Sequence, residues 1–340
     1  MSALSVLRAR VAKAWPFELV PSTPWSAQTP TWQDANPKVI DAALRRAGRR
    51  AGGNWFVIGG SSQISTKAFG TTVAGRQLVA WRGVDGALLV APRSCPHLGA
   101  DLATAPVDCG TLVCPWHGLR LGERRHGTWK PYPAYDDGVL CWVRLDPESG
   151  TEAGTPVSAP TDAPVVPLRP GEPTLAAVTR LEGVCEPRDI VANRLDPWHG
   201  AWFHPYSFTR LRVLSAPAAD DDLPEDLDRF VVEVTFHIGR LGVPVIAEFT
   251  TPGPRTVVMR IVEGEGRGSV VETHATPLGP GPDGRPRTAV IEAVVAHSDR
   301  PRFGVGLVAA PVIRPLMRQA ANRLWRDDLA YAERLFELRS

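Results

Sequence analysis

Short apolar runs separated by glycine-rich segments occupy the first half of the chain. Four of them combine β-branched, aromatic and other apolar residues, at positions 55–58, 77–81, 87–90 and 139–145. Runs of this length between turn-forming residues are typical of β-strands. We therefore expect an all-β domain over residues 53–147.

The second half of the chain alternates apolar and polar positions over longer stretches. This pattern favours strands of an antiparallel sheet, whereas the segments near 187–204 and 311–338 are expected to be helices. The fold class predicted for the whole chain is α+β, with the helices packed on an antiparallel sheet. The expected strands cover residues 175–181, 230–238, 245–250, 256–261, 269–276 and 288–297.

The segments outside these two regions complete the expected domain organisation. Residues 1–52 contain five prolines and predict an extended arm followed by one helix over 37–50. Residues 148–173 are rich in Pro, Thr, Ala and Gly and predict a linker. The all-β domain thus covers 53–147, and the domain of helices and antiparallel sheet covers 174–340.

The composition is that of an ordinary globular protein. Of 340 residues, 44% are hydrophobic and 22% are charged, and the net charge is +2, so no nucleic-acid partner is expected. The longest apolar run, 303–313, is too short for a membrane anchor, and the N-terminus lacks the features of a signal peptide. Five cysteines in such a chain favour a reducing, cytoplasmic location.

Four arginines, at positions 45, 46, 49 and 50, crowd the end of the first predicted helix. We expect them to form a solvated helix end, and the alternative is a docking patch for an acidic ferredoxin. The acidic loop over 220–228 is also expected to be solvated. Neither segment is assigned a role in chemistry.

Two short cysteine-histidine signatures lie in the predicted all-β domain. They are Cys95-Pro96-His97 and Cys114-Pro115-Trp116-His117, with sixteen residues between them. A Rieske [2Fe-2S] cluster has two thiolates on one iron and two imidazoles on the other, so one Cys and one His from each signature would complete it. The alternative is a zinc site, whose usual spacing does not interleave Cys and His in this way.

A second motif lies downstream, in the helix predicted near 187–204. It reads N-x-x-D-x-x-H-x-x-x-x-H, from Asn193 through Asp196 and His199 to His204. The first three residues share one face of a helix, whereas the gap of five turns His204 away, so both histidines reach one metal only if the helix is irregular, for instance at a π-bulge. Two histidines and a carboxylate form the facial triad of non-haem iron oxygenases. A carboxylate is therefore expected elsewhere.

Together the two motifs resemble those of the Rieske non-haem iron oxygenases, the terminal oxygenase components of multicomponent systems. The resemblance spans nearly the whole chain and implies that the cysteines and histidines of the two signatures bind the [2Fe-2S] cluster. Rieske proteins of quinol-oxidising complexes differ, because they carry an additional cysteine in each loop where this chain has Ala100 and Trp116. The compact chain resembles the monooxygenases and O-demethylases of the family.

The resemblance also implies a mononuclear Fe(II) held by three residues. His199 and His204 would be two ligands, and the third would be Asp328, because the family's carboxylate ligand commonly has a Glu five residues later and Glu333 has that spacing. Asp327 is the alternative ligand. Capping of the C-terminal helix by one of these two aspartates is a further alternative.

Two other residues of the second motif have roles implied by the family. Asp196 would bridge a histidine of the cluster, His117 or His97, in one subunit and His199 in the neighbouring subunit, orienting the imidazoles. Asn193 would be a polar group near the iron or, equally, a residue with a helix-start or hydrogen-bonding role.

The implied function is that of an oxygenase component. Electrons would pass through the cluster to Fe(II), where O2 would hydroxylate or oxidatively demethylate a small molecule. Trp198, Trp202 and Phe203 flank the histidines; the alternatives are that they belong to the core or that they line a pocket, and in the second case they favour an apolar substrate. Since no nicotinamide or flavin motif is present, NAD(P)H would deliver electrons through a separate ferredoxin or flavin reductase. A homotrimer is expected, and the alternative function is that of a non-catalytic Rieske electron-transfer protein.

Overall fold

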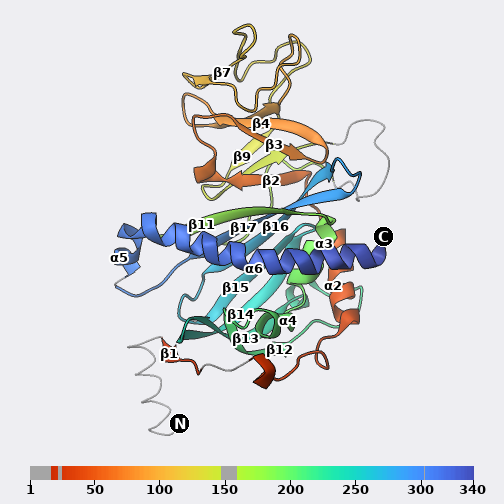
Figure 1. Cartoon of the computed structure of the whole chain (residues 1–340), viewed down its shortest axis with the longest axis vertical. Helices are drawn as coiled ribbons and strands as arrows, with labels where there is room; N and C mark the ends of the chain where they lie inside the picture. The colour runs from red at the N-terminus through yellow and green to blue at the C-terminus, as the bar shows by residue number, and fades with distance from the viewer. Residues whose placement is uncertain (1–16, 22–24, 147–158, 302) are drawn as a thin grey trace.

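The computed structural model describes residues 17–21, 25–146, 159–301 and 303–340. Residues 1–16 of the predicted arm and 148–158 of the predicted linker lie outside the described residues. A module of small sheets lies above a module built on one large sheet (Figure 1). The predicted α+β class, with an all-β part preceding a part of helices and antiparallel sheet, is confirmed.

The small-sheet module is folded from nine short strands. They form three sheets, β2-β10-β9, β3-β4-β5 and β6-β7-β8, and each pairing within them is antiparallel. Cys95 and Cys114 lie in a buried cluster that also contains Trp81, Leu102 and Leu112, so the core of this module fixes the bases of both signature loops. The strands are β2 (Trp55–Gly60), β3 (Phe69–Val73), β4 (Arg76–Arg82), β5 (Leu88–Pro92), β6 (Val107–Asp108), β7 (Thr111–Val113), β8 (Arg120–Leu121), β9 (Ala134–Asp136) and β10 (Leu140–Arg144).

The large-sheet module contains an antiparallel sheet in the order β11-β17-β16-β15-β14-β13-β12, and a short strand, β1 (Glu18–Leu19), pairs with β14. Strand β13 has the predicted bounds, whereas β12 was not predicted. The strands are β11 (Leu175–Gly183), β12 (Phe208–Ser215), β13 (Phe230–Ile238), β14 (Leu241–Gly253), β15 (Thr256–Gly264), β16 (Val270–Pro280) and β17 (Pro286–Ala296).

Helices cover this sheet, and the longest of them, α6, runs across it (Figure 1). Trp325 and Leu329 of α6 pack in one buried cluster with Ile190 and Leu195. Asn36 begins α2, because its side-chain oxygen accepts a hydrogen bond from the backbone N–H of Lys38 in the first turn, as expected of an N-cap residue. No helix within the described ranges meets the length and apolarity that a membrane span needs. The α-helices are α2 (Pro37–Arg49), α3 (Pro187–Arg194), α4 (His199–Phe203), α5 (Phe303–Val308) and α6 (Ala310–Arg339).

The helix predicted near 187–204 is divided in two. Helix α3 ends at Arg194 and α4 begins at His199, so four residues interrupt the helical path and His204 follows as the C-cap of α4. This break supplies the irregularity that the five-residue gap between the histidines requires. It takes the form of a break between two helices and not of a π-bulge.

The arginines at the end of α2 are paired within the chain. Arg46 is buried and lies 2.6 Å from the buried carboxylate of Asp228, which also accepts a 3.0 Å hydrogen bond from Arg50. Arg45 pairs with Asp221 at 2.9 Å. The acidic loop therefore has a structural partner, and this part of the expected solvated helix end is instead a contact between α2 and the loop.

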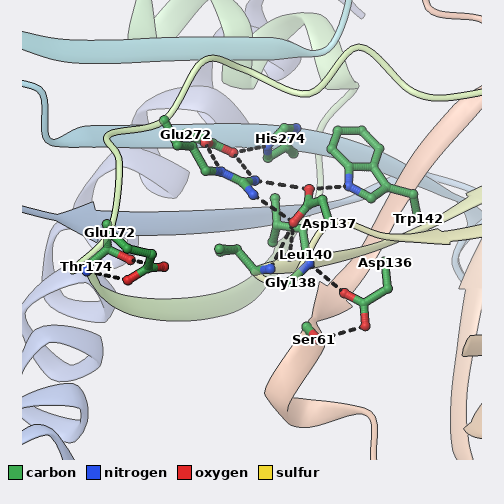
Figure 2. A network of polar contacts seen from close by, with 12 residues as sticks. Ser61, Asp136, Asp137, Gly138, Leu140, Trp142, Glu172, Thr174, Glu272 and His274 are labelled. Carbon is green, nitrogen blue, oxygen red and sulfur yellow. Dashed lines mark hydrogen bonds and ion pairs between the residues drawn. The ribbon is translucent and has the colours of Figure 1, made fainter. Parts of the chain in front are cut away.

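A buried ionic network joins the two modules (Figure 2). The guanidinium of Arg169 contacts Asp137 at 2.7 Å and Glu272 of β16 at 2.6 Å. Trp142 donates to Asp137 at 2.7 Å, and His274 lies 3.4 Å from Glu272. Burial opposes ionisation of both acids, but their hydrogen bonds and charge interactions with Arg169 prevail and lower the pKa of each.

Candidate metal centres

The two signature loops have the same backbone hydrogen bonds. In each loop the cysteine N–H donates to a carbonyl five residues later, and a glycine four residues after the cysteine donates back to its carbonyl, all at 2.9 Å. These glycines, Gly99 and Gly118, have φ of 80° and 72°, a conformation that favours glycine. The sequence therefore builds two matching tight loops around Cys95 and Cys114.

Each loop places its cysteine inside and its histidine outside. Cys95 and Cys114 are 3% and 2% exposed, whereas His97 and His117 are exposed and their ring centres are 4.8 Å apart. The structure thus brings all four predicted residues together, with two thiols below two imidazoles. This donor set fits the unequal ligation of the two irons in a Rieske cluster.

Backbone amides surround the two sulfur atoms. The N–H groups of His97 and Leu98 hydrogen-bond Cys95, and the corresponding amides of the second loop hydrogen-bond Cys114. Burial raises the pKa of both thiols and the amides lower it, but the contact between the two cysteines acts in opposite directions, so the pKa of Cys95 is raised and that of Cys114 is lowered. Amides directed at sulfur favour the thiolate, which is the form that binds iron.

The large-sheet module contains a second group of potential ligands. One donor atom from each of His199, His204 and Asp328 lies within 4.8 Å of the others. The Nε2 atoms of His199 and His204 are 3.3 and 2.8 Å from the same oxygen, Oδ1 of Asp328. The structure therefore brings His199, at the start of α4, and His204, directly after α4, together with Asp328 of α6. Asp328 is the carboxylate that the sequence analysis preferred over Asp327.

This spacing suits a metal ion. Each histidine nitrogen is close enough to the Asp328 oxygen, at 3.3 and 2.8 Å, for one ion to contact both at about 2 Å, the usual length of a metal bond to imidazole or carboxylate. An imidazole lone pair and a carboxylate oxygen repel one another at 2.8 Å unless a proton or a cation lies between them. Two histidines and one carboxylate are, in addition, the donor set of the facial triad.

Electrostatic interactions in this group are strong. Burial by itself lowers the pKa of His199, but Asp196 and Asp328 outweigh it and raise this pKa to about 9. Burial would raise the pKa of Asp328, yet His199 and His204 hold it well below its usual range. The site therefore retains an ionised carboxylate, which attracts a cation.

Asp196 lies on the outer side of His199. Its Oδ2 is 3.6 Å from Nδ1 of His199 and accepts a 3.3 Å hydrogen bond from the hydroxyl of Tyr331, while Oδ1 accepts from the amide of Trp198 at 3.2 Å. The ring of Tyr331 stacks on His199, with centres 5.6 Å apart. Nδ1 of His199 is buried and has no hydrogen-bond partner among the described residues. Asp196 is the carboxylate that faces this nitrogen, at 3.6 Å.

Asp327 and Asn193 also lie beside the three donor residues. Asp327 accepts a hydrogen bond from Tyr206 at 2.5 Å, and its half-exposed carboxylate lies 3.7 Å from Nδ1 of His204, on the side of the ring away from the Nε2 atom that approaches Asp328. Asn193 is fully buried and donates to Asp328 at 3.2 Å, while its own Oδ1 lacks a partner in the described part of the chain. Asn193 thus contacts the candidate ligand directly.

Sequence reasoning missed the two tyrosines of this site. Tyr206 contacts Nδ1 of His204 at 3.2 Å, and Tyr331 reaches both Asp196 and His199. Each follows a recognised residue closely, because Tyr206 lies two residues after His204 and Tyr331 lies one helical turn after Asp328. That proximity was the signal available in the sequence.

Comparisons with known proteins identify both halves of the chain. The family model described as "Rieske [2Fe-2S] domain" matches residues 54–143, and the model described as "Domain of unknown function (DUF5914)" matches residues 155–340, more than half of the chain. The first match establishes the small-sheet module as a Rieske domain, which supports a [2Fe-2S] cluster in its two loops.

Among curated proteins, the chain is similar to two oxygenases. It is 39% identical over 75 residues to aminopyrrolnitrin oxygenase PrnD of Pseudomonas fluorescens, which is 22% of this chain and 21% of that protein. It is 25% identical over 205 residues to the 5,5'-dehydrodivanillate O-demethylase oxygenase subunit of Sphingobium sp., covering 54% of this chain and 46% of that protein. The chain thus matches less than half the length of each.

Among solved structures, the chain resembles dicamba monooxygenase bound to dicamba. The TM-score is 0.53 at 17% sequence identity, and the match covers 84% of this chain and 87% of that chain. At this identity the likeness concerns the fold. It extends over both modules, so the order and arrangement of the two are shared with that oxygenase.

Proposed function

The chain belongs to the Rieske oxygenase family, with a catalytic region of the DUF5914 family, and we propose that it acts as the oxygenase component of a monooxygenase or O-demethylase system. The observation that carries this proposal is the convergence of His199, His204 and Asp328 within 4.8 Å in a chain that also has a Rieske domain. A carrier of electrons alone has no need of a second set of ligands.

The proposal assigns the ligands of the two metal centres to the residues described above. Cys95, Cys114 and the two exposed histidines hold the [2Fe-2S] cluster, and His199, His204 and Asp328 hold Fe(II). When bound, the cluster supplies single electrons and Fe(II) supplies open positions for dioxygen chemistry. The protein orients these ligands through Asp196, Tyr206 and Tyr331.

Electron delivery requires a neighbouring chain. β7, which precedes the second cluster loop, is at the top of Figure 1, and α4, which carries His199, is in the lower half of the molecule. Electron-transfer rates fall steeply with distance, so we assign delivery to the cluster of an adjacent subunit in a homotrimer. Asp196 would then accept a hydrogen bond from the neighbour's cluster histidine while it orients His199. NAD(P)H would supply the electrons through a separate ferredoxin or flavin reductase.

The apolar surroundings of His204 support a substrate class for this proposal. The ring of Phe208 lies 6.0 Å from that of His204 and 5.4 Å from that of Phe236. Both phenylalanines border a cluster contributed by β12 to β15 that contains Val232, Val234 and Val245. We assign an apolar substrate, aromatic in its reacting part, since edge-to-face aromatic contacts are available here.

For an aryl methyl ether the reaction balances simply. One oxygen atom of O2 enters the methyl group, the resulting hemiacetal breaks its carbon–oxygen bond, and a phenol and formaldehyde are released. The other oxygen atom leaves as water after two electrons from the donor and two protons are consumed. The residues of the chain bind and orient the ether, while the redox chemistry belongs to the metals.

The first experiment measures iron and acid-labile sulfide per chain after anaerobic purification, together with an EPR spectrum of the reduced cluster. The oxygenase predicts one iron beyond those of the [2Fe-2S] cluster, and NADH-dependent formaldehyde release or hydroxylation from a panel of aryl ethers with a surrogate reductase. A cluster without further iron, even after iron reconstitution, would identify an electron-transfer protein instead.

A further inference from the structure

A small cavity lies where the Rieske domain meets the large sheet. Its volume is about 30 Å³, enough for one or two water-sized species. None of the candidate metal ligands lines it. Its walls come from β2, from the turn between β14 and β15, and from β16, and include Phe56, Trp142, Val165, Arg255, Thr256 and His274.

Arg255 is the charged residue of this cavity and it joins the two modules. Its guanidinium donates to the carbonyl of Trp55 at 3.0 Å and lies 4.2 Å from the ring centre of Phe56. Desolvation lowers its pKa to about 10, but a guanidinium remains protonated at neutral pH. A full positive charge is therefore held between the two modules.

Arg255 is only half-buried, and its partners are a carbonyl and an aromatic ring, not a carboxylate. Arg169 is paired with two carboxylates and Arg46 with one. No carboxylate of the described residues forms an ion pair with Arg255, and desolvation is the sole cause of its shifted pKa. An uncompensated cation in such a place is costly, so a counter-ion would be bound favourably.

The polar groups around Arg255 do not supply that counter-ion. Thr276 donates to a carbonyl of β2 at 2.7 Å, and the hydroxyl of Thr256 contacts His274 at 3.1 Å. Glu272, the acid nearest to His274, is occupied by Arg169 at 2.6 Å. These neighbouring side chains are thus committed to protein partners, and Arg255 is the one charged side chain among the residues that line the cavity.

We propose that this cavity is a binding site for a small inorganic monoanion of halide size, held by the guanidinium of Arg255 between the Rieske domain and the catalytic region. A volume of about 30 Å³ suits an ion of halide size. A bound halide would neutralise this half-buried charge and strengthen the contact of β2 with the β14–β15 turn. The site is independent of the proposed oxygenase activity, because no residue in it contacts the candidate metal centres.

The test uses bromide as the probe on the full-length protein with its metals bound. Anomalous diffraction from crystals grown in sodium bromide should show a peak in hydrogen-bond reach of the Arg255 guanidinium. In solution, the thermal unfolding midpoint should rise and then saturate as bromide replaces gluconate at constant ionic strength. At a bromide concentration 100 times its Kd, the ratio of folded to unfolded protein should be about 100-fold higher.

The matched variants are Arg255→Met and Arg267→Met. Arg267 is exposed and follows β15 at the end opposite to Arg255, so its variant should keep the bromide response that Arg255→Met loses. If Arg255→Met does not fold, the wild-type diffraction and titration decide alone. The proposal is overturned by the absence of a peak, by a peak without a saturable midpoint shift, which means binding at crystal concentration only, or by an equal shift in both variants.

Discussion

Tyr206 donates its hydroxyl hydrogen to Asp327 across 2.5 Å. Burial and this carboxylate raise the pKa of the tyrosine, so the hydroxyl stays protonated and its oxygen is free to accept from Nδ1 of His204 at 3.2 Å. That arrangement assigns the hydrogen of His204 to Nδ1 and leaves Nε2 as a lone pair directed toward Asp328. Asp327, the alternative ligand in the sequence analysis, therefore orients Tyr206 and, through it, His204.

Replacing Tyr206 should weaken the mononuclear site without affecting the cluster. Tyr206→Phe removes the acceptor that orients His204, and the loss of such supporting hydrogen bonds typically costs 10- to 100-fold in metal affinity, so we expect about that decrease. Iron retention during titration with a chelator measures it. Asp327→Asn keeps an acceptor for the tyrosine and should lose less. Unchanged iron affinity in Tyr206→Phe would show that the tyrosine does not position His204.

His199→Ala should separate the two metal centres. The variant removes one of three proposed ligands, so we expect loss of the mononuclear iron and of turnover, with the EPR signal of the cluster retained. The control is His126→Ala, at an exposed histidine of the Rieske domain, which should keep both centres. Loss of the cluster signal in His199→Ala would contradict the assignment of this histidine to a separate site.

Asp196→Asn tests the proposed route of electrons. The amide preserves the shape of the side chain but removes the charge that faces Nδ1 of His199 at 3.6 Å. Both metals should remain, while turnover falls by about 10- to 100-fold and the pre-reduced cluster stays reduced in the presence of substrate and O2. Tyr331→Phe, which removes only the 3.3 Å hydrogen bond to Asp196, should have a smaller effect. Normal cluster oxidation in Asp196→Asn would exclude this route.

Arg169→Met should destabilise the protein and alter its response to pH. Removing the guanidinium leaves Asp137 and Glu272 buried without their partner, at a cost of about 3–5 kcal/mol in the free energy of unfolding at pH 7. In the wild type the pKa values of both acids are lowered from 3.8 and 4.5, so their contribution is complete above pH 4.5 and is lost as the pH falls through the lower, folded-state values.

In Arg169→Met, the free energy of unfolding should change with pH in the opposite direction to that of the wild type. Without Arg169, burial would raise the pKa of both acids, so their protonation should relieve the penalty as the pH falls from 7 toward 4.5. Denaturant unfolding at several pH values measures both slopes. The control is Arg212→Met, which removes an exposed pair with Glu233 and should cost no more than about 1 kcal/mol. Parallel pH curves for wild type and Arg169→Met would rule out this role of the network.

Features carried by short-range sequence patterns were predictable. The cysteine-histidine loops depend on neighbours within five positions, and β13 follows from its alternating apolar residues. Strand β12 was missed although Leu211 and Val213 alternate with Arg210 and Arg212; the strand is irregular, with two register shifts in its pairing and a φ of 51° at Arg210. Its position immediately after the histidines nevertheless brings Phe208 beside His204.

Contacts between residues far apart in sequence were not predictable from local pattern. His204 and Asp328 are 124 positions apart, and the choice of Asp328 over Asp327 in the sequence rested on family spacing. Arg169 and Glu272 are 103 positions apart. Arg169 lies in the segment predicted as a linker, and its partners become apparent only when two modules meet. The physical reason is that packing, not local propensity, selects these partners.

The distance between β7 and α4 in one chain (Figure 1) has a genetic consequence under the proposed route. Each subunit would give electrons to one neighbour and receive them from another, so a chain lacking its cluster could still turn over substrate beside an intact donor. Two alleles that are each inactive, one altered at Cys114 and one at His199, should therefore complement one another when they are coexpressed and assemble together.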